Sequence, residues 1–91
     1  MTSPPAGKER RHPRRIYVSP FAYRFPAASG IHFGVTSNIS ESGLCVYSDV
    51  RPDQGEQIEF RSSLPVPSSR ATVRWVKKDA ENLYKMGLVF E

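Results

Sequence analysis

The feature that most constrains the fold is a series of short strand-like segments separated by turn residues. Six segments rich in β-branched, aromatic or alternating apolar residues are separated by five stretches that each contain proline, glycine, serine or asparagine. They cover residues 16–25, 31–36, 44–47, 57–61, 71–77 and 83–90. No segment keeps an apolar period of 3.6 residues, so no long helix is expected. The pattern predicts an all-β fold, a six-stranded antiparallel β-barrel with little or no C-terminal helix.

Two of these segments carry further information. Pro20 cannot donate a hydrogen bond to a neighbouring strand, so the first strand is expected to be interrupted or to lie at an edge. In the second segment, Ile31, Phe33 and Val35 alternate with other residues and share one face.

The length of 91 residues suits one small domain with a single core. Residues 1–9 are rich in proline, serine and charge and are expected to form a disordered tail, and residues 10–91 form the domain. The single cysteine, Cys45, excludes an internal disulfide and lies in an apolar run typical of the core. No stretch reaches the ~18 apolar residues of a membrane span, and the N-terminus has no hydrophobic signal region. We therefore expect a cytoplasmic protein.

The net charge of +4 is confined to the N-terminal segment. Residues 1–15 contain five basic residues and one acid, whereas the other 76 residues contain eight of each. A nucleic-acid-binding barrel more often spreads its basic residues over one face, interleaved with aromatic ones. The charge distribution favours a local anion clamp over a generic polyanion surface.

Two polar motifs offer chemistry for recognising a ligand. Residues 10–15 (RRHPRR) contain four arginines, whose planar forks suit phosphate oxygens and the O6/N7 edge of guanine. Residues 38–43 (NISESG) place an amide, two hydroxyls and a glycine in an expected turn between two strands. The amide can both donate to and accept from a base edge, and the glycine allows positive φ or close backbone approach. Together the motifs indicate a site for a phosphate-bearing, guanine-containing ligand.

With these residues the chain resembles the PilZ domain family, which binds the bacterial second messenger cyclic di-GMP. The family signature is RxxxR before the first strand, followed by [D/N]xSxxG. Residues 10–14 and 38–43 match the two parts in order, and residues 71–78 and 84–90 resemble the last two strands of the family. The resemblance covers residues 9–91.

The arginine motif can be read in two registers, Arg10/Arg14 or Arg11/Arg15. The position of Pro20 favours the first register, whereas Ile16 directly after the arginines favours the second. In the family, an arginine just before the motif tends to accompany an intercalated ligand pair. That position is Glu9 in one register and Arg10 in the other, so one or two ligands per chain are both open.

The resemblance implies roles for particular residues. The arginines would bind phosphates and guanine edges from a flexible segment that becomes ordered with ligand, and Asn38 would address the Watson–Crick edge of guanine. Ser40 and the backbone at Gly43 would close that side. The expected ligand residues are Arg10, Arg11, Arg14, Arg15, Asn38, Ser40 and Gly43, with Ser42 and Trp75 as secondary candidates.

Other functions find less support. No nucleophile–base–acid set and no phosphate-binding glycine loop is visible, so we expect no enzyme. His32 and His12 are too few for a zinc site, and no cofactor or metal is expected. The chain stops at Glu91, where many PilZ domains continue into a helix, so self-association and an unidentified downstream protein partner are expected. The alternatives are a ligand-independent PilZ-like interaction module and a small basic nucleic-acid binder.

Overall fold

A computed structural model describes residues 13–91 of the chain. This part of the chain contains seven β-strands and no helix. The strands are β1 (Arg15–Ile16), β2 (Pro20–Arg24), β3 (His32–Ile39), β4 (Gly43–Ser48), β5 (Gln57–Phe60), β6 (Arg70–Ala80) and β7 (Leu83–Phe90). The predicted all-β class is therefore confirmed.

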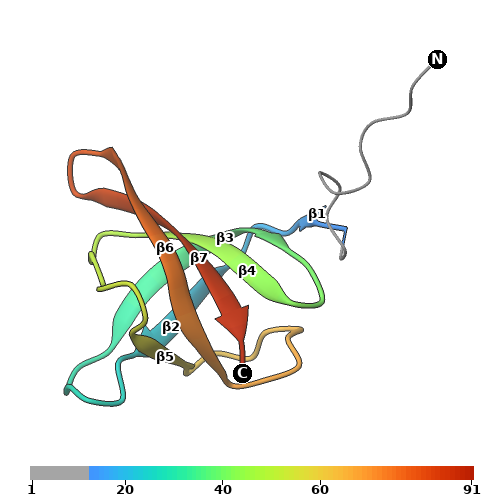
Figure 1. Cartoon of the computed structure of the whole chain (residues 1–91), viewed down its shortest axis with the longest axis horizontal. Coiled ribbons are helices and arrows are strands. Elements are labelled where there is room, and N and C mark those ends of the chain that lie inside the picture. Colours follow the sequence, from blue (N-terminus) through green and yellow to red (C-terminus); the bar gives the residue numbers. More distant parts are fainter. Residues whose placement is uncertain (1–12) are drawn as a thin grey trace.

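The strands close into a barrel. Hydrogen-bonded neighbours follow the order β3-β2-β5-β6-β7-β4, and β4 pairs back to β3, so all six strands have two partners. Every pairing is antiparallel. Strand β1 is an extra strand that pairs with the end of β3 beyond β2 (Figure 1). The six-stranded barrel expected from the sequence is confirmed, with one short strand added to it.

The first strand-like segment is interrupted, as Pro20 predicts, but the break lies at residues 17–19, just before the proline. The buried Thr36 of β3 bridges this break. Its hydroxyl donates to the Tyr17 carbonyl and accepts from the Ser19 N–H, with 2.8 Å between the Ser19 nitrogen and Thr36 Oγ1. One threonine thus satisfies the backbone where the regular ladder is lost and holds β1 in line with β2.

The core fills the inside of the barrel with side chains from all six strands. Tyr23 is almost completely buried, and its hydroxyl lies 2.6 Å from Ser48 Oγ, so the only polar atom of the ring is satisfied. The buried cluster comprises Phe21, Tyr23, Phe25, Ile39, Leu44, Val46, Ile58, Phe60, Ala71, Val73, Met86 and Leu88. Aromatic rings of β2 stack within it, with 5.4 Å between the centroids of Phe21 and Tyr23.

One local expectation is confirmed and one needs correction. Ile31, Phe33 and Val35 share one face, as expected; this face points outward, with Phe33 69% exposed, whereas Gly34 and Thr36 face the core. The inward position of Gly34 leaves room for the Phe21 ring, which a side chain there would strike. Residues 38–43 are not all turn, because Asn38 and Ile39 end β3 and Gly43 begins β4.

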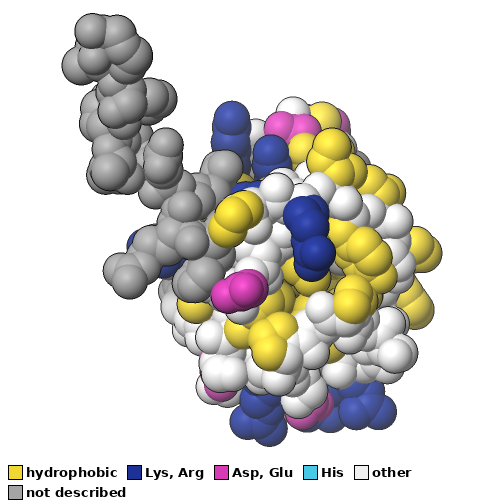
Figure 2. Space-filling model, turned by 90° about the vertical axis from the view of Figure 1, so that its right-hand side faces the viewer, with side chains coloured by type: hydrophobic (Ala, Val, Ile, Leu, Met, Phe, Trp, Pro, Cys, Tyr) yellow, Lys and Arg dark blue, Asp and Glu magenta, His cyan; other side chains and the backbone are white. Residues whose placement is uncertain are grey.

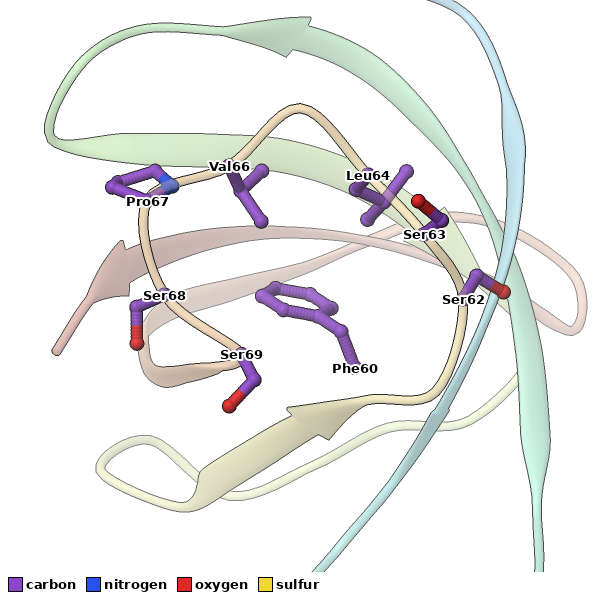
Figure 3. Close-up of a pocket in the computed structure, with 8 residues that line it drawn as sticks. All are labelled: Phe60, Ser62, Ser63, Leu64, Val66, Pro67, Ser68 and Ser69. Atoms are coloured by element: carbon purple, nitrogen blue, oxygen red, sulfur yellow. The ribbon is translucent and has the colours of Figure 1, made fainter.

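One end of the barrel is covered by the loop of residues 61–69, which joins β5 to β6. The loop arches over Phe60 and lines an open pocket of about 220 Å³ (Figure 3). It is tied to β2 at its start, where the Ala22 N–H donates to Ser62 Oγ at 2.7 Å. Leu64 and Val66 pack against the core from this loop.

The expected tail, residues 1–9, lies outside the described residues, as do residues 10–12 of the arginine segment 10–15 that was expected to be flexible. Within residues 13–91, no helix has the length and apolar character required to cross a membrane.

Replacing Thr36 by valine should destabilise the barrel by about 1–3 kcal/mol, because two backbone groups at the break lose their partner. Urea unfolding of both proteins measures the difference. Thr72→Val is the matched control, since the Thr72 hydroxyl contacts only the exposed Glu91 carboxylate among the described residues. Equal losses in both variants would contradict the bridging role of Thr36.

Burial raises the pKa of the Tyr23 hydroxyl; the hydrogen bond with Ser48 partly opposes this increase, and the negative charge of Asp49 adds a smaller one. The folded protein therefore holds this proton more tightly than the unfolded chain does. The corresponding stability is complete below pH ~10 and is lost as pH rises toward the folded-state pKa. Tyr23→Phe should show a smaller decline of unfolding free energy above pH 10 than the original protein, and parallel declines would count against this assignment.

Candidate functional site

The outer face of the sheet brings polar and aromatic residues of four strands into one row. Asn38 of β3 pairs with Cys45 of β4, Cys45 with Gly87 of β7, and Gly87 with Trp75 of β6. Directly opposed residues of an antiparallel pair point to the same side of the sheet. The row therefore places Asn38 and Trp75 on one surface, separated by two small residues.

Arg14 reaches this surface from the residue before β1. Its Nη1 donates to Asn38 Oδ1 at 2.8 Å, and the contact is partly buried. The pairing of β1 with the end of β3 (Ile16 opposite Asn38) brings the two side chains together. Residues that are 24 positions apart in the sequence thus meet, one from each of the two sequence motifs.

Ser40 organises the turn between β3 and β4. Its N–H donates to the Gly43 carbonyl at 2.9 Å, and its Oγ accepts from the N–H groups of Ser42 and Gly43 at 3.3 and 3.2 Å. The two serine hydroxyls lie 3.3 Å apart. Ser40 is buried, so its first role is to hold the turn, whereas Ser42 is exposed beside it.

Gly43 is required for close packing and not for positive φ. A Cβ at this position would strike the carbonyl oxygen of Leu88 on β7. The positive φ angles among the described glycines occur at Gly30 and Gly55. The glycine of the second motif therefore lets β4 approach β7 directly below the turn.

Trp75 lies over Gly87. A Cβ on Gly87 would strike the indole nitrogen and the ring atoms beside it, so the indole rests against the bare backbone of β7. The side chain remains 39% exposed. A half-exposed indole lying against the sheet offers an aromatic surface for a planar ligand.

Three residues on this surface had not been predicted as site residues: Cys45 in the row, and Tyr47 and Lys85 beside it. Burial raises the pKa of the Cys45 thiol, and the positive charges of Lys85 and Arg14 partly oppose the increase. In the adjacent row Tyr47 pairs with Lys85, and the Lys85 ammonium lies 5.6 Å from the centre of the Tyr47 ring. The alternation within segments 44–47 and 83–90 could have found them, because Cys45 and Tyr47 share a face, as do Lys85 and Gly87.

The structure divides the predicted arginines. Arg10 and Arg11 lie outside the described residues. Arg14 contacts Asn38, whereas Arg15 pairs with the inward-facing Ile39 and lines a cavity at the end of the barrel. Arg14 and Asn38 therefore meet on the outer face, with Ser42 and Gly43 in the turn beside them and Trp75 across the row. Arg15 instead lines the cavity, to which the buried Ser40 also contributes.

Gly87→Ala should displace the indole of Trp75, because the new methyl group and the ring cannot share the space. Trp75 is the only tryptophan of the chain, so its fluorescence reports the change directly. We expect a shift of the emission maximum and greater quenching by iodide. The control is Gly55→Ala, which strains a turn at positive φ but adds its methyl group in open space, so it reports a general loss of stability without displacing the indole. Unchanged emission in Gly87→Ala would contradict the packing described.

Comparison with known families places these observations in context. The family model described as PilZ domain matches residues 8–91, which is nearly the whole chain. A comparison with curated proteins finds no match to this chain. The family match includes both polar motifs, the row of residues between them and every strand of the barrel. The chain therefore belongs to the PilZ domain family.

Proposed function

We propose that this domain is a receptor for cyclic di-GMP that passes the signal to a partner protein. The observation that carries the proposal is the contact between Arg14 and Asn38, which brings the two halves of the family signature together. Membership of the PilZ family supports the ligand class, because these domains bind the dinucleotide and are not enzymes.

The chemistry of each group suits one part of the ligand. The guanidinium of Arg14 can bind a phosphate oxygen or a guanine O6/N7 edge while one of its nitrogens stays on Asn38. Asn38 can accept from a guanine N–H, and the exposed Ser42 hydroxyl is available beside it. Ser40 acts indirectly, by holding the turn between β3 and β4 in place.

The Arg10/Arg14 register is the one we propose for binding. It places its second arginine on Asn38, whereas the second arginine of the other register, Arg15, lines the cavity on the inner side. In this register the residue before the motif is Glu9. A single ligand per chain is then the expected stoichiometry, since an arginine at that position accompanies the intercalated pair in the family.

Trp75 and Lys85 extend the proposed site across the sheet. The indole offers an apolar surface to a purine that reaches beyond Asn38, and the ammonium of Lys85 adds positive charge for a phosphate. Between Asn38 and the indole lie only the small residue Cys45 and Gly87, on which the indole rests, so a flat ligand would contact Asn38 and the indole together.

A second candidate function gains some support from the same surface. Tyr47 and Trp75 alternate there with Lys77, Lys85 and Arg14, an arrangement that single-stranded nucleic acids also bind. Binding to an oligonucleotide should then weaken steeply as salt increases. Cyclic di-GMP, with two phosphates, should show a much shallower dependence.

Isothermal titration with cyclic di-GMP tests the leading proposal. Arg14→Ala and Asn38→Ala should each weaken binding by about 5- to 150-fold, because each removes a contact of roughly 1–3 kcal/mol. The effects should not add fully, since the two side chains contact each other.

Arg61→Ala provides the matched control for charge. This exposed arginine lies near the Glu59 carboxylate, in the part of the barrel around β5. Its loss removes the same charge away from the proposed site, so affinity should stay within about twofold. Absence of binding heat with the original protein would contradict the proposed function. Equal losses of affinity in Arg61→Ala and Arg14→Ala would contradict the proposed site.

A further inference from the structure

Strand β1 leaves one edge of the sheet open. Among the described residues it pairs only with β3 and ends the strand order. Tyr17 and Ser19 direct their N–H groups toward β3, the first to the Ser37 carbonyl at 3.0 Å and the second to Thr36. Because successive residues of an extended chain alternate, the N–H and C=O groups of Ile16 and Val18 point to the opposite side. That side presents a short row of backbone donors and acceptors.

The loop of residues 61–69 runs past this edge but does not pair with it. It is joined to β2 at Ser62 and then turns away over Phe60 (Figure 3). Pro65 and Pro67 have no N–H to give, and the N–H of Val66 between them donates to the Leu64 carbonyl. Residues 65–67 of the loop therefore offer no N–H to the edge of β1.

A cavity of about 400 Å³ lies between the β1 edge and this loop. Ile39, Pro65, Val66 and Pro67 supply apolar walls, while Arg15, Ser40 and Glu41 supply polar ones. The space-filling view toward this end of the barrel shows apolar side chains among charged and polar ones (Figure 2). The cavity reaches β1 at Arg15, the residue next to Ile16, whose outward backbone groups pair with no other strand of residues 13–91.

We propose that this edge and cavity bind an extended peptide segment of a partner protein. The segment would add a strand to β1 through the backbone groups of Ile16 and Val18. Alternate side chains of an added strand point to opposite faces. One would enter the cavity, and its neighbours would lie on the outer face beside Ile16, which is 87% exposed.

The lining determines which peptide fits. The walls of Ile39, Pro65, Val66 and Pro67 favour an apolar side chain in the cavity, since Arg15 and Glu41 in the lining carry opposite charges. Arg14 and Arg15 flank the edge with positive charge, so acidic residues next to the apolar one would be attracted. The same arginines disfavour a second copy of this chain, because antiparallel pairing of two β1 edges would bring them close to their counterparts. This site does not depend on cyclic di-GMP.

The test is to pan a phage-displayed library of random dodecapeptides against the whole protein without cyclic di-GMP. Enriched peptides should alternate apolar and other residues and carry at least one acid. Synthetic copies should bind Val18→Pro at least tenfold more weakly, because proline removes an outward N–H. Phe33→Ser, an exposed apolar change on the other side of the strand break, is the matched control and should leave binding unchanged.

A second measurement does not depend on how a variant folds. Two versions of the peptide are N-methylated at every other residue, one at odd and one at even positions. Methylation of the N–H groups that face β1 should abolish binding, and methylation of the other set should leave it unchanged. Amide exchange at Ile16 and Val18 should also slow in the complex. The proposal is overturned if no peptide is enriched, if both methylated versions bind alike, or if these amides are protected in a dimer of the protein alone.

Discussion

The position of the candidate site depends on one buried hydroxyl. Thr36 replaces the regular ladder where the chain between β1 and β2 departs from β3, and it does so as both donor and acceptor. Besides this bridge, the segment is held to β3 by the two residue pairs of β1, by backbone hydrogen bonds of Tyr17 and Ser19, and by the Arg14–Asn38 contact. The bridge fixes the direction in which the chain enters, and that direction places Arg14 over Asn38. A core residue thus positions a surface contact about two residues away along β3.

Much of the fold could be predicted from local pattern. Turn residues separate the strands, and the alternating pattern predicted the last two strands, which correspond to β6 and β7. Alternation also placed Ile31, Phe33 and Val35 correctly on one face, but it could not tell that this face is the exposed one. Periodicity reports which residues share a face but not which face is inside. The inward side of β3 has room only for glycine beside Phe21, at Gly34, and this is a property of packing between strands.

The candidate site could be predicted only in part from the sequence. The two motifs were visible as runs of suitable chemistry, but the choice between Arg14 and Arg15 depends on the register of β1 with β3. Lys85 and Tyr47 were missed because their proximity arises from the pairing of β4 with β7, which no short motif encodes. Arg10 and Arg11 lie outside the part of the chain that the structure describes, so their roles stay predictions.

The close approach of β4 and β7 at Gly43 has a consequence for how variants of this domain are interpreted. The backbone of Leu88 occupies the space where any larger side chain would begin. A substitution of this signature residue therefore acts on the barrel itself before it acts on a ligand. If a variant at position 43 loses binding, this loss alone does not show that the glycine recognises the ligand. Asn38, which can be altered without closing that gap, separates recognition from folding.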